Sequence, residues 1–225
     1  MARMALSTLF AMIAAQALLA SPTAAAIRGT VTVPTLGNGT GANLNPYPGR
    51  ANSIASPARL KRGAVTDAVI YLDGPAPTAS ATNDGPITHE RLAQKGQAFV
   101  PRVLPVLVGT RIDFPNEDPI YHNVFSVSPA KRFDLGKYAR GKSKSAVFEK
   151  TGRINVYCDI HSNMEAFILV LPNRWFAQPD AEGRFALPDL PPGSYRVKAW
   201  HPDFGERTLP LEVLDGTAPT LGVAF

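Results

Sequence analysis

The chain has few of the residues on which several classes of protein depend. It contains one cysteine and four histidines in 225 residues. One cysteine excludes an internal disulfide, and four histidines are too few for the crowded histidine clusters of multicopper oxidases and two-centre copper enzymes. Only 18% of the residues are charged, against 45% hydrophobic, which excludes a disordered or coiled-coil chain. The 21 prolines and 18 glycines favour a turn-rich β protein.

The N-terminus has the pattern of a secretory signal. Arg3 precedes the uncharged stretch Met4–Ala20, Ser21-Pro22 interrupts any helix, and Ala24–Ala26 supplies small residues before a cleavage point. This order predicts a signal peptide over residues 1–26 and an exported, periplasmic protein. An uncleaved anchor is the alternative. No later stretch is long and apolar enough to cross a bilayer, so we expect no stable membrane insertion after cleavage.

The positive charge is concentrated in one short stretch. The formal net charge is +5, and six basic residues opposed only by Asp134 lie between positions 131 and 144: Lys131, Arg132, Lys137, Arg140, Lys142 and Lys144. A solvated loop is the simplest interpretation. The alternative is a docking surface for an acidic protein, since complementary charge accelerates association. Nucleic acid is not an expected partner of an exported chain.

The rest of the chain predicts two β units. Residues 27–33 indicate a first strand, and a Gly-, Pro- and Asn-rich loop follows to residue 63. Short strands and close turns over residues 64–171 predict a β-sandwich. Residues 172–225 form a second, small β-sandwich unit. Its roughly fifty residues are few for an independent core, so we expect it to be completed by strand 27–33.

One segment has the residue types of a metal site. Cys158, His161 and Met164 have the spacing Cys-x2-His-x2-Met between two predicted strands, and His122 begins an earlier strand. Two imidazoles and a thiolate with an axial thioether are the ligands of a mononuclear blue-copper site. A buried structural cysteine is the non-functional alternative. Zinc is the competing metal, although thioether is a poor zinc ligand.

Several motifs resemble those of the plastocyanin and amicyanin branch of the cupredoxins. They are Phe99-Val100-Pro101, Val108-Gly109-Thr110, Phe114-Pro115-Asn116 and His122-Asn123-Val124-Phe125, together with the short ligand loop. More closely, residues 64–201 resemble exported cupredoxin-domain proteins of the methylamine utilisation type. The resemblance implies a Greek-key cupredoxin β-sandwich, so the expected fold class is all-β.

The same resemblance implies roles for individual residues. His122, Cys158, His161 and Met164 would be the copper ligands, and Asn123 would bond across to the Cys158 loop. Asp159 stands where the family has Ser or Thr. A carboxylate beside the thiolate should stabilise Cu(II) and lower the reduction potential.

The C-terminal unit resembles carboxypeptidase-regulatory and transthyretin-like sandwiches through its Asp-x-x-Gly-x-Phe and Pro-x-Gly-x-Tyr patterns. Such units usually have no catalytic residues, so a structural or adhesive role is expected. His201 is predicted to have a packing or surface role, and His89 a surface position.

The leading functional hypothesis is a periplasmic one-electron carrier with one type 1 copper, and His161 as the ligand nearest the surface. Its redox partner would be a dehydrogenase or a cytochrome. One alternative is a copper-binding or delivery protein without a redox partner. Another is a metal-free β-sandwich binding module. We do not expect an enzyme, because no Ser-His-Asp or paired-carboxylate arrangement stands out.

Overall fold

The computed structural model describes residues 25–35, 63–75, 77, 89–217 and 219–225. Within these ranges the regular structure is β, apart from one turn of 3-10 helix, η1 (Val65–Asp67). The all-β fold class is therefore confirmed. Residues 1–24 of the predicted signal peptide and most of the predicted loop to residue 63 lie outside the described residues, whereas residues 25 and 26 of that prediction begin a strand.

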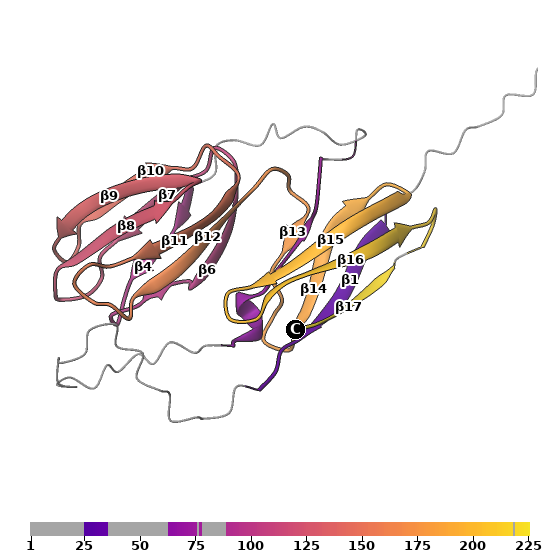
Figure 1. The fold of residues 1–225 in the computed structure, drawn as a ribbon, viewed down its shortest axis with the longest axis horizontal. Helices are drawn as coiled ribbons and strands as arrows, with labels where there is room; N and C mark the ends of the chain where they lie inside the picture. The colour runs from indigo at the N-terminus through magenta and orange to yellow at the C-terminus, as the bar shows by residue number, and fades with distance from the viewer. Residues whose placement is uncertain (1–24, 36–62, 76, 78–88, 218) are drawn as a thin grey trace, which may run out of the picture.

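The first β unit packs two sheets against each other (Figure 1). The five-stranded sheet has the order β6 (Val103–Leu107), β12 (Glu165–Leu171), β11 (Gly152–Tyr157), β8 (His122–Ser128), β9 (Lys131–Tyr138). The three-stranded sheet has the order β10 (Ser143–Val147), β7 (Arg111–Pro115), β3 (His89–Arg91). A short hairpin joins β4 (Ala93–Gln94) to β5 (Phe99–Val100). Strand β6 pairs in parallel with β12, which requires a long return connection of the Greek-key kind.

Alternation of apolar residues builds the core of this unit. Ile112 and Phe114 on β7 and Ile154 and Val156 on β11 are all fully buried. Their period of two places one side of each strand between the sheets. The same cluster of buried residues contains Cys158 and Met164. The predicted ligand loop is therefore anchored at one end of the hydrophobic core.

The second β unit has two further sheets. One has the order β14 (Arg184–Leu190), β1 (Ala25–Thr32), β17 (Thr220–Ala224), and the other has the order β13 (Phe176–Ala177), β2 (Val69–Leu72), β15 (Gly193–His201), β16 (Gly205–Val213). Strand β1 lies between β14 and β17, so the first strand of the chain completes the C-terminal unit (Figure 1). Gly29 permits this insertion, because a Cβ there would lie 2.2 Å from the Leu221 oxygen and 2.4 Å from Phe185.

The boundary predicted at residue 64 differs from the structure. Strand β2 was placed in the first unit, but it pairs with β13 and β15 of the second. Its Ile70 and Leu72 lie in the core of that second unit. A short apolar strand fits either core, and nothing in its sequence identifies its pairing partners.

A third apolar cluster joins the two units. Val69 and Trp200 from the second unit pack with Val103, Leu169 and Leu171 from the first. All five side chains are largely buried, so the units share a hydrophobic interface. Among the described residues, no helix has the length and apolar character needed to span a membrane.

Candidate metal centre

His122, Cys158 and His161 meet at one end of the first unit. Their ligand atoms all lie within 4.8 Å of one another. His122 is the first residue of β8, and Cys158 directly follows β11. These strands are antiparallel neighbours, with Tyr157 opposite Phe125. The start of one and the end of the other therefore lie at the same edge, which is why residues 36 positions apart come together.

The spacing of the three donor atoms suits a single metal ion. The two imidazole Nδ1 atoms are 3.1 Å apart, and each lies 3.9 Å from Cys158 Sγ. Around a first-row metal with nitrogen bonds of about 2.0 Å and a thiolate bond of about 2.3 Å, ligand atoms would be separated by roughly 3.3–3.8 Å. The cluster is close to these separations. The residues present therefore fit a small, nitrogen- and sulfur-bound ion such as copper.

Met164 lies on the same short loop. Its side chain is fully buried, and its backbone N–H donates to the His161 oxygen at 3.0 Å. This bond closes the turn between the second histidine and the start of β12. Met164 and Cys158 belong to the same core cluster. Met164 would therefore be the residue of this loop that supplies a thioether ligand to a metal held there.

The surroundings of Cys158 favour its thiolate. Burial raises the pKa of the thiol, but a hydrogen bond with His122 and the backbone N–H groups of Asn123, His161 and Ile160 outweigh it, so the pKa lies below its usual value. The thiolate is the form that binds metals. The fold therefore holds Cys158 ready for coordination.

The two histidines differ in exposure. His122 is completely buried, whereas His161 is half-buried. Burial and the positive charge of His122 lower the pKa of His161, which favours the neutral, ligating imidazole. Among the four predicted ligands, His161 is the one that reaches the surface.

Asn123 reaches the Cys158 loop differently from the way the resemblance implied. Its side-chain Nδ2 donates to Asp134 Oδ1 on β9 at 2.7 Å. Its backbone N–H is the group that bonds to Cys158. The second neighbour, Asp159, is exposed, and its carboxylate lies 3.9 Å from Lys137 Nζ. Its negative charge is therefore partly balanced by Lys137 and screened by solvent.

Asp118 lies beside the candidate metal centre, and the sequence analysis did not predict it there. Its Oδ2 is 2.8 Å from His122 Nε2, the ring nitrogen opposite the one that faces Cys158. Burial lowers the pKa of His122, but its bonds with Cys158 and Asp118 outweigh this and raise it. The only signal in the sequence was its position four residues before His122. In a loop, which has no regular period, that spacing does not predict a contact.

A second group of possible ligands lies between the units. Asp67, His201 and Asp203 also place their ligand atoms within 4.8 Å. Here Arg102 Nη1 contacts Asp67 at 2.9 Å and Asp203 at 2.8 Å. His201 Nε2 is 3.0 Å from the Ala64 oxygen, and its Nδ1 accepts the Asp203 N–H at 3.1 Å. A guanidinium and the backbone already bond to this group.

His201 has the packing role predicted for it, since it is fully buried and its ring lies 4.6 Å from that of Phe204. His89 is exposed on β3, as predicted.

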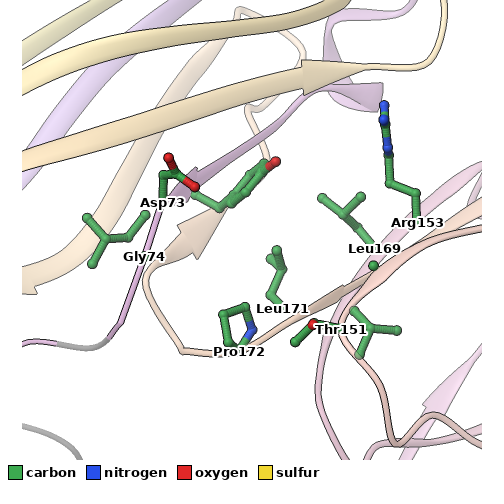
Figure 2. A pocket seen from close by; sticks show the side chains of 11 residues that line it. Asp73, Gly74, Thr151, Arg153, Leu169, Leu171 and Pro172 are labelled. Atoms are coloured by element: carbon green, nitrogen blue, oxygen red, sulfur yellow. The ribbon is translucent and has the colours of Figure 1, made fainter. Parts of the chain in front are cut away.

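A cleft of about 280 Å³ lies between β2 and the strands β11 and β12 (Figure 2). Asp73, Arg153 and Leu171 are in its lining, which contains no histidine or cysteine. The cleft is therefore not an alternative copper site.

Comparison with known proteins identifies copper proteins among the solved structures. No protein-family model and no curated protein matches the chain. A Cu-containing nitrite reductase from Thermus scotoductus SA-01 is 27% identical with a TM-score of 0.37, over 38% of this chain and 23% of that chain. A purple cupredoxin from Nitrosopumilus maritimus is 22% identical with a TM-score of 0.33, over 36% of this chain and 99% of that chain.

A Cu(I) form of an amicyanin mutant is 18% identical with a TM-score of 0.35, over 47% of this chain and 99% of that chain. The chain spans less than a quarter of the reductase, but nearly the whole length of the two small proteins. Because every one of these TM-scores is below 0.5, the metal assignment rests on the side chains described above.

Proposed function

We propose that this protein is an exported, periplasmic one-electron carrier with a single type 1 copper site. One observation carries the proposal: His122 Nδ1, His161 Nδ1 and Cys158 Sγ converge on one another, with buried Met164 on the same loop. This donor set combines borderline imidazoles with soft sulfur, which serves both Cu(II) and Cu(I). Copper would supply a one-electron couple, because it changes between these two oxidation states.

The protein's own part is to hold the donors still. His122 belongs to β8 and Cys158 directly follows β11, and both strands lie in the interior of the five-stranded sheet. The Met164–His161 backbone bond closes the loop. Because the donors are fixed before and after the electron moves, little rearrangement opposes transfer. Burial of His122, Cys158 and Met164 keeps water out, and half-buried His161 offers the electron a route to the surface.

We further propose that the protein is not an enzyme and that an acidic redox protein docks near the site. Strand β9 brings Lys137 to the metal end, since Lys137 lies opposite Asn123 in the β8–β9 pairing. Lys131 and Arg132 lie at the other end of that strand. The turn that follows β9 is held to Asn116 by two backbone hydrogen bonds. The Gly141 N–H donates to the Asn116 oxygen at 2.7 Å, and the Asn116 N–H donates to the Lys142 oxygen at 2.9 Å. Arg140 and Lys142 are exposed there.

Docking by charge is tested with hexacyanoferrate(III), an anionic oxidant. Lys142→Glu should slow oxidation of the reduced protein, and the difference from wild type should shrink as salt is added. Lys150→Glu is the matched control. Lys150 is exposed and lies just before the start of β11, at the end of that strand away from Cys158. Equal slowing in both variants would contradict docking at the metal end.

We propose that the chain is of the methylamine utilisation type of cupredoxin protein, with a carboxypeptidase-regulatory or transthyretin-like second unit. The two small sheets of the second unit and its shared interface with the first support a structural role for it. Whether methylamine is involved is a separate question, answered by identifying the redox partner.

The decisive test is a visible absorption spectrum of the Cu(II)-loaded protein beside a Cys158→Ser variant. An intense thiolate-to-copper band that disappears in the variant is the expected result. A colourless protein that binds Cu(I) and releases it to a chelator without unfolding would favour copper delivery instead. A protein that binds neither oxidation state would contradict both and leave a binding module.

A further inference from the structure

A buried carboxylate lies behind the buried histidine of the candidate copper site. Asp118 is 6% exposed, and its Oδ2 is 2.8 Å from His122 Nε2. The opposite ring nitrogen, Nδ1, faces His161 Nδ1 at 3.1 Å and Cys158 Sγ at 3.9 Å. One side of the imidazole therefore meets a carboxylate, and the other meets the remaining ligands.

The Asp118 carboxylate is held in place by the tight turn between β4 and β5. The Gly96 N–H donates to Oδ1 at 2.5 Å, and the Gln97 N–H donates to Oδ2 at 2.8 Å. Gln97 has a φ of 57°, a left-handed conformation that is uncommon for a residue other than glycine. In this conformation the turn directs two successive backbone donors at one carboxylate.

The loop on which Asp118 stands is fixed independently. Asn116 is almost fully buried, and its Oδ1 accepts the Asp118 N–H at 2.9 Å. Its Nδ2 donates to the oxygens of Ile120 at 2.8 Å and Tyr138 at 2.9 Å. Asp118 is thus tied to the sandwich through its backbone as well as its side chain, and cannot swing away from His122 without breaking several bonds.

Both oxygens of the carboxylate act as acceptors: the Gly96 N–H donates to Oδ1, and the Gln97 N–H donates to Oδ2, the oxygen that faces His122. A carboxylate anion accepts hydrogen bonds and donates none. His122 must therefore present a proton on Nε2 to satisfy the contact, which leaves the Nδ1 lone pair free to coordinate a metal.

We propose that Asp118 is a positioning residue for the copper ligand His122: it fixes the ring orientation and the Nε2–H tautomer, and it favours Cu(II) over Cu(I). This inference rests on the proposed function. A carboxylate bonded to the outer nitrogen of a ligating histidine increases the basicity of the ligand. Its nearby negative charge stabilises the more positive oxidation state. The reduction potential is therefore lower than it would be without Asp118.

The tautomer is tested first, on copper-free protein. The Cys158→Ser variant removes the thiolate that competes for the His122 ring, and nitrogen-15 NMR at alkaline pH, where histidines are neutral, identifies the protonated nitrogen. We expect the His122 proton on Nε2, in slow exchange with solvent. A proton on Nδ1 would overturn the assignment of Asp118. This measurement needs no bound copper and no change at Asp118.

The potential is tested next, with Asp118→Asn and a matched control. Glu117→Gln removes the same charge one residue away, from a side chain that pairs with Arg91 rather than with a ligand. We expect Asp118→Asn to lose about 10- to 100-fold in Cu(II) affinity. Each tenfold loss not shared by Cu(I) raises the potential by about 59 mV. Glu117→Gln should be close to wild type.

These measurements distinguish a failure of the proposed role of Asp118 from a failure of the proposed copper site. Equal potentials and Cu(II) affinities in Asp118→Asn and Glu117→Gln, with both variants folded, would overturn the role of Asp118 while leaving the blue site intact. If Asp118→Asn fails to fold, the His122 tautomer in Cys158→Ser, which retains Asp118, still decides the orientation. A wild-type protein without a blue band would contradict the proposed function, and the tautomer of the copper-free protein would still decide whether Asp118 orients His122.

Discussion

Two groups of three possible metal ligands lie in the part of the chain that the structure describes, and they differ in what already bonds to them. At the end of the first unit, His122, His161 and Cys158 direct their donor atoms at one another. Between the units, Asp67 and Asp203 direct theirs at the Arg102 guanidinium, while His201 bonds to backbone. Short distances between ligand-type side chains are common to both, so distance alone does not identify a metal site.

The burial of each group explains its chemistry. Desolvation is costly for a charged group unless a partner offsets it. The Arg102 cluster carries its own cation, because Arg102 has a side-chain exposure of 7% and bonds to Asp67, Asp203 and Glu165. In the first group the buried acid near the ligands, Asp118, bonds to the outer side of the His122 ring. A cation is therefore built into one group, whereas the donor atoms of the other group face one another.

Removing the built-in cation should have the largest effect. Arg102→Met leaves two buried carboxylates without a counterion, and the free energy of unfolding should fall by about 3–5 kcal/mol. Denaturant titration of the copper-free protein measures this. Arg153→Met is the control, since that guanidinium is exposed over the Trp200 ring. A loss below about 1 kcal/mol for Arg102→Met would show that the cluster is not held by its arginine.

Copper itself should stabilise only the first group. A ligand that binds the folded state alone, at a free concentration about 100-fold above its dissociation constant, adds about 2.7 kcal/mol to the free energy of unfolding. Wild type and His201→Asn should both show this increase, and Cys158→Ser should not. An increase in Cys158→Ser equal to that of wild type would place the copper elsewhere.

His201 should matter for packing and not for copper. His201→Asn removes a ring packed against Phe204 and one of the bonds to the backbone, so we expect a loss of about 1 kcal/mol in stability. The visible band should keep its position and intensity. A weakened or shifted band in this variant would make the two groups dependent on each other.

Asp159 should have the smallest effect. Its carboxylate is 47% exposed beside Lys137, and exposed charge is screened by water and salt. Asp159→Asn should raise the reduction potential, as the sequence analysis predicted, but by less than Asp118→Asn. A redox titration of both variants gives the order. A larger shift for Asp159→Asn would reverse the relative importance of the two carboxylates.

The ligand loop was predictable because its spacing is local. Cys158, His161 and Met164 lie within seven residues, and the alternating apolar residues of β11 and β12 place them between two strands. His122 could be added because it begins a strand of similar character. The all-β fold class followed from the prolines, glycines and short alternating runs.

Contacts between distant segments were not predictable in the same way. Asp118 is orientated by Gly96 and Gln97, which belong to a different hairpin. Strand β2 pairs with β15, more than a hundred residues later. Arg102 looks like any surface arginine in the sequence, yet tertiary packing buries it against two acids. Such pairings depend on the assembled sheets, and no spacing rule within one segment encodes them.

The most direct test of the copper assignment is an anomalous difference map at the copper absorption edge, from crystals of the copper-loaded protein. The expected result is one peak enclosed by His122, Cys158, His161 and Met164, with none beside Asp67, His201 and Asp203. A peak at the second group, or no peak among the first four residues, would contradict the assignment of copper to those four ligands.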